Sequence, residues 1–270
     1  MSPLESKSFE TVLTAPGTGH PGTIRLTHPV CAFAPTPASM ISFQTIVSSG
    51  SLLVGAGVDW GCGCGILTVA AARLPTVEQV IALDISRENV EATRHNLRMN
   101  GVEAKARALV SNSFVCLDSG DQEQIDCWRG ELDFVIANPP TSGDGDGFNF
   151  RRTVLRDSAE FLKAGGVVFL SVSSQYGKER ILGLIDEIPG YSYDGMLATT
   201  PPAPFDLMRS DLLDSLRVYV MEEKRGGLPY EFVDPGNFNR HLTATEVMKD
   251  FEGQGTVPLS RWQTHLYRRG

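Results

Sequence analysis

Three glycines at alternate positions, Gly61, Gly63 and Gly65, join a short apolar run to a helix-like segment. Without a Cβ atom, a glycine lets the backbone turn sharply and approach a ligand closely. The dinucleotide-binding pattern needs its third glycine where this chain has Ile66. A P-loop needs Gly-Lys-Ser/Thr, and no lysine lies near this turn. The glycine run therefore indicates a ligand-binding strand–helix turn of another kind.

Acidic residues end the two apolar runs beside this turn. Asp59 precedes the glycines, and Asp84 closes the next apolar run. A carboxylate at the end of the first strand repels phosphate but suits a ligand with a cationic amine or sulfonium. A carboxylate at the end of the second strand lies where it can accept hydrogen bonds from ribose hydroxyls. Together they predict a nucleoside ligand that also carries positive charge.

Short apolar runs alternate with helical segments through the middle of the chain. None of the runs alternates strictly between apolar and polar residues, which is typical of parallel strands covered on both faces. We therefore expect an α/β fold with a doubly wound, mostly parallel sheet and helices on both faces. The expected strands are 52–59, 80–84, 106–110, 133–137 and 167–172, and the expected helices are 39–49, 66–74, 86–100, 151–162 and 177–188.

The ends of the chain are less regular than its middle. We expect an N-terminal extension over 1–50 that contributes to the site, a ligand-binding domain over 51–225, and a C-terminal extension or lid over 226–270. Gly165 and Gly166 are expected to end a helix. The remaining expectations are a last strand at 216–222, a short helix at 243–251 and a basic ending at 261–269. We expect this ending to be a solvated tail, with contact to an anionic partner as the alternative.

Net charge, apolar content and the number of cysteines and histidines limit which partners and ligands the chain is expected to bind. The net charge of −8 gives no general attraction to phosphate, so nucleic acid is the less favoured partner. No run approaches the roughly 18 apolar residues of a membrane span, and the N-terminal residues do not resemble a secretory signal. The five cysteines form no Cys-x-x-Cys pair, and the five histidines are scattered. We expect a cytoplasmic protein with reduced thiols, no metal site and no membrane partner.

The glycine turn and its two acids resemble those of class I S-adenosylmethionine-dependent methyltransferases, over about residues 30–190. The resemblance implies S-adenosyl-L-methionine as cofactor and a seven-stranded Rossmann-like sheet. In that family the first acid and the glycine loop hold the methionine part, and the second acid holds the ribose. Asn112 stands where the family usually places an acid for the adenine amino group, and its amide oxygen can accept the same hydrogen bond. The implied cofactor residues are Asp59, Gly61, Cys62, Gly63, Gly65, Asp84, Ile85, Asn112, Ser113 and Asn138.

A second motif, Asn138-Pro139-Pro140, ends the apolar run 133–137. Two prolines stop the strand and leave the Asn138 side chain and the Pro139 carbonyl at the carboxyl edge of the sheet, where doubly wound folds bind ligands. Two acceptors close together can hold both hydrogens of an –NH2 group and direct its lone pair at a methyl group. Asn138 and Pro139 are therefore the expected catalytic residues.

This motif resembles the Asn-Pro-Pro-aromatic motif of amino-methyltransferases that act on glutamine amides, adenine N6 or guanine N2. Thr141 replaces the aromatic residue, which removes a stacking surface worth roughly 1–3 kcal/mol to a base. Phe148 or Phe150 would compensate for it or serve as lid or packing residues. The expected substrate-binding residues are Pro140, Thr141, Phe148 and Thr36, with Phe33 beside them.

The segment from Gly147 to Gln175 resembles release-factor glutamine methyltransferases. This resemblance implies an N-methyltransferase, with a protein or peptide amide as the favoured methyl acceptor. A small-molecule amine and an RNA or DNA base stay open as alternatives. A catalytically silent scaffold subunit is the remaining alternative, and the intact glycine loop, both acids and the Asn-Pro-Pro motif argue against it.

Overall fold

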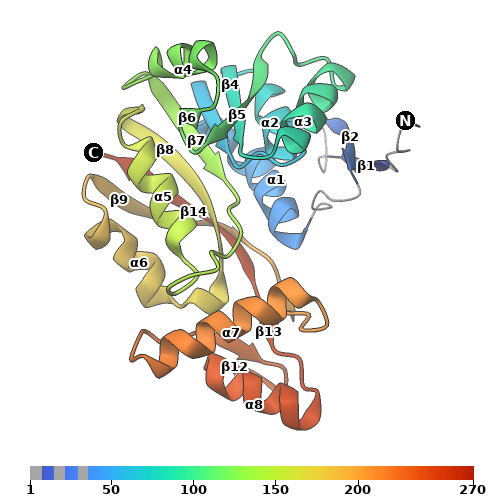
Figure 1. The fold of residues 1–270 in the computed structure, drawn as a ribbon, viewed down its shortest axis with the longest axis vertical. Coiled ribbons are helices and arrows are strands. Elements are labelled where there is room, and N and C mark those ends of the chain that lie inside the picture. The colour runs from blue at the N-terminus through green and yellow to red at the C-terminus, as the bar shows by residue number, and fades with distance from the viewer. Residues whose placement is uncertain (1–7, 15–21, 30–35) are drawn as a thin grey trace.

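The computed structural model describes residues 8–14, 22–29 and 36–270 (Figure 1). Its centre is an eight-stranded sheet with the order β6 (Val115–Cys116), β5 (Ala106–Asn112), β4 (Val77–Asp84), β3 (Gly55–Trp60), β7 (Leu132–Ala137), β8 (Leu162–Ser173), β14 (Trp262–Arg269) and β9 (Tyr191–Thr199). Strands β5, β4, β3, β7 and β8 are parallel, whereas β14 is antiparallel to both its neighbours and β6 to β5. The mostly parallel sheet is confirmed, and the two-residue β6 extends the expected seven strands to eight.

Helices cover both faces of this sheet. One face carries α1 (Pro37–Ser49), α2 (Ile66–Ala72) and α3 (Arg87–Met99), and the other carries α4 (Ser119–Asp126), α5 (Asn149–Ser158) and α6 (Lys178–Glu187) (Figure 1). Successive side chains of a strand point to opposite faces. Accordingly, Val135 of β7 packs in the core beside α5 and α6, while Phe134 and Ile136 pack in the core beside α1 and α2. Burial on both faces explains why the central strands are apolar throughout.

The helix boundaries follow local capping chemistry. The Thr36 hydroxyl caps α1 by accepting a hydrogen bond from the Ser39 amide at 3.2 Å, and Ser86 caps α3 as expected. Helix α5 ends at Ser158, so the expected helix to residue 162 was too long. Gly165 and Gly166 lie inside β8, where its pairing with β7 shifts register, instead of ending a helix.

A smaller body of four antiparallel strands and two helices lies below the main sheet in Figure 1. Its strands, in sheet order, are β10 (Ala203–Pro204), β13 (Leu259–Ser260), β11 (Phe232–Asp234) and β12 (Asn237–Leu242), and its helices are α7 (Ser210–Lys224) and α8 (Ala244–Gln254). Helix α8 confirms the helix expected at 243–251, and Thr243 and Glu246 form its capping box.

Two expectations for this part of the chain were wrong. The segment 216–222 belongs to α7, because its buried residues Leu216, Tyr219 and Val220 repeat with the period of a helix. The supposed solvated tail is β14, which lies between β8 and β9 in the main sheet. Its side chains from Thr264 to Tyr267 are buried. The three-part division at residues 50 and 225 stays a prediction.

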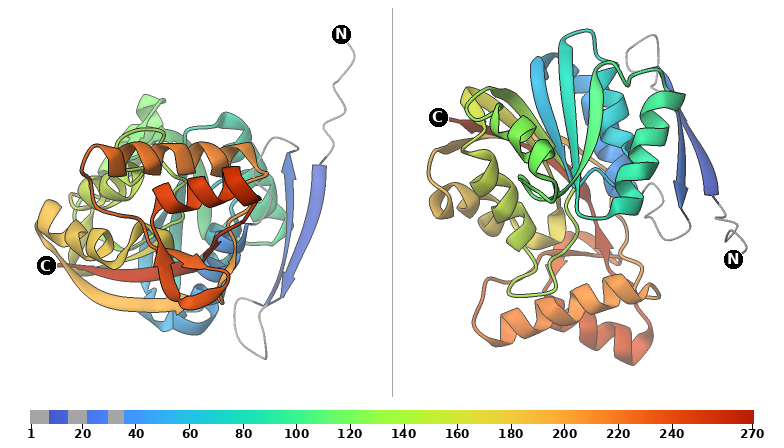
Figure 2. Two further views of the ribbon diagram at one scale, coloured as in Figure 1. Left: turned by 90° about the horizontal axis from the view of Figure 1, so that it is seen from below. Right: turned by 45° about the horizontal axis from the view of Figure 1, so that its top comes forward.

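At the other end, β1 (Ser8–Thr14) and β2 (Thr23–Pro29) form a hairpin beside α3 (Figure 2). The Asn96 side chain of α3 accepts from the Thr27 amide at 2.8 Å and donates to the Thr27 carbonyl at 2.8 Å and to the Cys64 carbonyl at 2.7 Å. One buried amide therefore connects the hairpin to the glycine loop. None of the helices in the described ranges is long and apolar enough to cross a bilayer.

Candidate active site

The glycine loop connects β3 to α2 with three left-handed residues. Gly61, Gly63 and Gly65 have φ values of 71°, 55° and 83°, a region that favours glycine. A Cβ atom on Gly65 would lie 2.8 Å from the Thr93 side chain of α3, whereas no atom lies within 4 Å of a Cβ placed on Gly61 or Gly63. Gly65 therefore allows close helix packing, while the other two glycines leave open space for a ligand.

Asp84 organises this loop from the end of β4. Its carboxylate accepts hydrogen bonds from the Gly63 amide at 2.8 Å and the Ser86 amide at 2.9 Å, and from the Asn89 side chain at 3.2 Å. The side chain lines the cavity and is 8% exposed. A carboxylate has about four lone-pair sites, so with three of them occupied it can still accept a hydrogen bond from one ribose hydroxyl.

Asp59 lies deeper, at the end of β3, and is 1% exposed. The Thr68 hydroxyl donates to one carboxylate oxygen at 2.5 Å. Burial raises the pKa of Asp59 to about 7, because the charged form loses its hydration. No cation pairs with Asp59 among the residues described, yet the side chain lines the cavity. The arrangement suits a cationic group supplied by a ligand.

The residues expected to bind adenine line the same cavity. Asn112, at the end of β5, is exposed and lines the cavity together with Ser113 and Ile85. Ser113 has a left-handed φ of 54°, and its hydroxyl accepts from the Trp60 indole at 2.9 Å. Ile85 is 69% exposed and offers an apolar surface beside Asp84.

The Asn-Pro-Pro motif follows β7 into the same cavity. The Asn138 amide donates to the Ser39 hydroxyl of α1 at 3.3 Å, which leaves its carbonyl oxygen free to accept. The guanidinium of Arg151 donates to the Pro139 carbonyl at 2.8 Å and to the Pro140 carbonyl at 2.9 Å. A carbonyl oxygen has two lone pairs, so Pro139 can still accept one more hydrogen bond.

Thr141 is held by tyrosines. Its hydroxyl lies 3.0 Å from the Tyr219 hydroxyl of α7, and the Tyr176 hydroxyl donates to it at 3.1 Å. Tyr219 itself is fully buried. The position that is aromatic in the similar motif therefore joins a hydroxyl cluster between the main sheet and the smaller body.

One cavity of about 790 Å³ collects most of the expected residues, a volume within the usual range for ligand sites. Of the expected residues, those that line it are Thr36, Asp59, Gly61, Cys62, Gly63, Asp84, Ile85, Asn112, Ser113, Asn138, Pro139, Pro140 and Thr141. Gly65 lies behind the loop as the N-cap of α2. Phe148 is fully buried, 4.7 Å from the Tyr176 ring, and does not line the cavity. Phe33 lies outside the described residues.

The cavity also contains residues that sequence reasoning missed. Ser39 comes from α1 and Arg151 from α5, and the smaller body and β14 add further residues. Phe150 of α5, which the sequence offered as a possible replacement for the aromatic position, also lines the cavity. A helical reading of the α7 segment would have placed several of its side chains on one face, and this was the signal in the sequence for the part of the cavity wall that α7 forms. The additional lining residues from this part are Phe205, Arg209, Asp211, Leu212, Ser215, Trp262 and Gln263.

The fold and the glycine loop define the class of protein. A doubly wound sheet whose first strand leads through a glycine turn into a helix, with acids ending the first two strands, is the arrangement of a class I S-adenosylmethionine-dependent methyltransferase. Residues 38–188 match the methyltransferase small domain family. This match covers more than half of the chain, and the chain belongs to that family.

The chain is similar in sequence to proteins named as ribosomal RNA methyltransferases. Ribosomal RNA small subunit methyltransferase C of Pseudomonas entomophila is 33% identical over 118 residues, which are 43% of this chain and 32% of that protein. The protein of the same name from Escherichia coli is 34% identical over 110 residues, 40% of this chain and 28% of that protein. The chain thus spans about a third of the length of the curated relatives it matches.

A solved structure has the same fold. It is a 16S rRNA N2 methyltransferase of T. thermophilus in complex with AdoMet and guanosine. The TM-score is 0.54 at 22% sequence identity, and the match covers 73% of this chain and 49% of that chain. At this identity the likeness concerns the fold alone.

Proposed function

We propose that the protein transfers a methyl group from S-adenosyl-L-methionine to the exocyclic amine of an RNA base. The observation that carries the proposal is that Asn138 and Pro139 line the same cavity as the glycine loop. A methyl donor in the loop and an amine on the Asn-Pro-Pro turn would meet inside one cavity.

The bound cofactor supplies an activated methyl group on a sulfonium. Asp84 would hold its ribose, Asp59 its cationic methionine part, and Asn112 its adenine. The Asn138 side-chain oxygen and the Pro139 carbonyl oxygen would each accept a hydrogen bond from one N–H group of the amine that receives the methyl group. These oxygens would also stabilise positive charge that develops on the nitrogen. No strong base is required, because the alkylated nitrogen loses its proton readily.

Aromatic side chains in the cavity support a base as acceptor. Phe150 lines the cavity at 38% exposure, with its ring centre 6.2 Å from that of Trp60. These rings offer the flat surface that Thr141 lacks, and a base can stack on such a surface. The curated relatives named as ribosomal RNA methyltransferases support the same choice. A protein amide, favoured by the sequence, is the second candidate because Thr141 sits in the aromatic position.

Transfer of labelled methyl to a fractionated lysate tests this choice. We expect label in RNA that nuclease digestion converts to a methylated nucleoside, and incorporation about a hundredfold slower with the Asn138→Ala variant. Label confined to protein, or to small molecules, would contradict the RNA assignment while leaving the methyltransferase class intact.

A further inference from the structure

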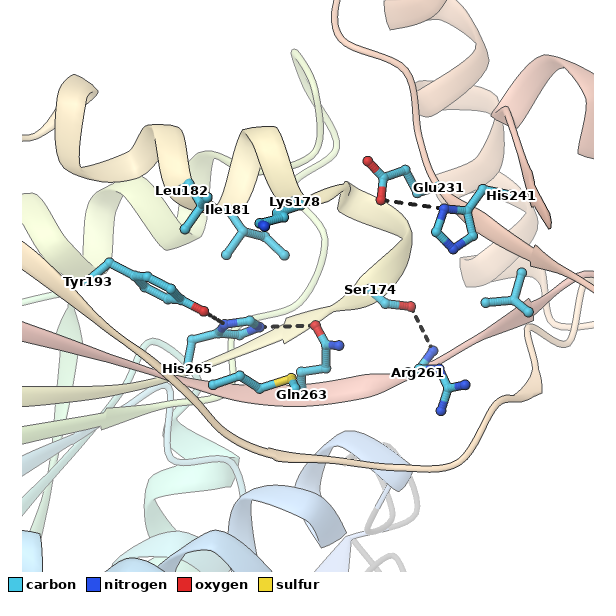
Figure 3. Close-up of a pocket in the computed structure, with 12 residues that line it drawn as sticks. Ser174, Lys178, Ile181, Leu182, Tyr193, Glu231, His241, Arg261, Gln263 and His265 are labelled. Carbon is cyan, nitrogen blue, oxygen red and sulfur yellow. Dashed lines mark hydrogen bonds and ion pairs between the residues drawn. The ribbon is translucent and has the colours of Figure 1, made fainter. Parts of the chain in front are cut away.

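A second cavity of about 330 Å³ lies on the α6 face of the main sheet (Figure 3). Lys178, Ile181 and Leu182 of α6 form one wall, and β9 and β14 form the floor. The smaller sheet closes the far side with Glu231, next to β11, and other residues. The function proposed above uses none of these side chains.

A chain of hydrogen bonds fixes the floor. His265 is 4% exposed, its Nδ1 lies 2.9 Å from the Tyr193 hydroxyl, and its Nε2 lies 3.1 Å from Gln263 Oε1 (Figure 3). Burial lowers the pKa of His265 to about 4, so the ring is neutral near pH 7 and carries one N–H. Because Oε1 only accepts, Nε2 carries that hydrogen and the Tyr193 hydroxyl donates to Nδ1.

These hydrogen bonds orient the Gln263 side chain through its Oε1 atom. Its –NH2 group is turned away from His265 and has no hydrogen-bond partner within the described part of the protein (Figure 3). Gln263 also lines the large cavity that contains Asn138. The residue therefore stands between the two cavities and offers two free N–H groups there.

Two basic side chains, Lys178 and Arg261, line the second cavity, and neither forms an ion pair with an acid in the described ranges. The acid of the cavity, Glu231, faces His241 at 3.8 Å. Between these groups the wall is apolar, with Ile181 and Val233 both buried. A fitting ligand has a flat apolar body with hydrogen-bonding edges and an attached anion, which is the chemistry of a nucleotide.

We propose that the second cavity binds the nucleotide next to the target base in the same RNA strand, with its phosphate at Lys178 and Arg261 and its base beside Gln263. This inference rests on the proposed RNA acceptor. Continuity through Gln263 supports it, because neighbouring nucleotides must occupy adjoining spaces. Since the whole chain has a net charge of −8, local cations are needed to hold a phosphate.

The test measures how RNA binding depends on salt. The probe is a fluorescein-labelled single-stranded RNA of mixed sequence and about 12 nucleotides, within the size range of single-strand sites. Binding is followed by anisotropy between about 50 and 200 mM salt, where each lost phosphate contact reduces the logarithmic slope by about 0.7. The double variant Lys178→Gln/Arg261→Gln should have a slope shallower by about 0.7 to 1.4. The matched control, Arg98→Gln/Arg156→Gln, removes the same charge from exposed positions that line neither cavity.

A second variant tests the space without changing charge. Met196→Trp places a large ring at the edge of the second cavity, where Met196 is 47% exposed. We expect RNA affinity to fall several-fold with the salt slope unchanged, and cofactor affinity by calorimetry to match the wild type in every variant. If wild-type protein methylates RNA but the double variant keeps the wild-type slope, the flanking-nucleotide site is refuted and the proposed function stands. If wild-type protein neither binds nor methylates RNA, both proposals fail.

Discussion

Asp59 allows a quantitative test of the cofactor site, because its carboxyl group is buried with no cation beside it in the described structure. Its pKa is raised from 3.8 to about 7 by burial. In the unfolded chain the group ionises near pH 4, whereas in the folded protein it stays protonated up to about pH 7. Ionisation of the folded protein therefore costs free energy that the unfolded chain does not pay.

The sign and size of the effect follow from linkage. When the pKa of a carboxyl group is higher in the folded state than in the unfolded chain, the free energy of unfolding decreases as pH rises between the two pKa values, here from about 4 to 7. Above that range the decrease stays constant. The difference between the two pKa values corresponds to roughly 4 kcal/mol at 1.36 kcal/mol per pH unit. Asp59→Asn keeps the shape and the Thr68 hydrogen bond but removes the titration. Without cofactor, the variant should therefore gain up to about 4 kcal/mol over the wild type between about pH 4 and 8.

Cofactor binding should show the opposite preference. A cationic ligand beside Asp59 stabilises the carboxylate, so binding below about pH 7 releases a proton and tightens about tenfold per pH unit as pH rises. Urea unfolding at several pH values measures the stability difference, and calorimetry in buffers of different ionisation enthalpy counts the released protons. Parallel unfolding profiles for wild type and Asp59→Asn, or cofactor affinity independent of pH, would refute the assignment of Asp59.

Substitutions at four further positions, Asp84, Asn138, Pro139 and Arg151, separate cofactor binding, chemistry and stability. Asp84→Ala should weaken S-adenosyl-L-methionine about ten- to a hundredfold in calorimetric titration, through loss of charge-assisted hydrogen bonds worth about 1.5–3 kcal/mol, and an unchanged dissociation constant would contradict the ribose role. Asn138→Ala should keep cofactor affinity within a few-fold but lower turnover about 10²-fold. Pro139→Ala should lower turnover less, because the backbone carbonyl remains. Full activity of Asn138→Ala would show that Asn138 only ends the strand and has no catalytic role. Arg151→Met should lower the free energy of unfolding by about 2–4 kcal/mol, since two carbonyls lose a buried donor, whereas the exposed Arg156→Met should change it little; equal melting temperatures would argue against this role.

The sequence predicted the parallel half of the sheet because its signals are local. Apolar runs, the cap at Ser86 and the glycines of the loop each depend on a few neighbouring residues. Asp59, Asp84 and Asn138 could be placed together because parallel strands present their carboxyl ends at one edge.

The acceptor side depends on contacts between distant segments, which no local pattern contains. Arg151 holds the Asn-Pro-Pro turn through side-chain bonds that its place in an amphipathic helix does not suggest. The strand β14 looked like a solvated tail because basic residues stand at both ends of the segment 261–269, yet both its neighbours in the sheet lie elsewhere in the chain. Phe148 and Phe150 are close in sequence, but the start of α5 sends one into the core and the other into the cavity.

The position of β14 has a consequence for how the protein folds. This strand separates β8 from β9, although β9 follows β8 in the chain and the smaller body lies between β9 and β14. Until β14 arrives, the facing edges of β8 and β9 have unpaired backbone groups, and such edges favour association with other chains. Closing the sheet also requires contacts between residues far apart in sequence, which slows folding. We expect a late, rate-limiting insertion step, and because Trp262 and Gln263 enter the cavity with this strand, the acceptor wall is completed only when the sheet is.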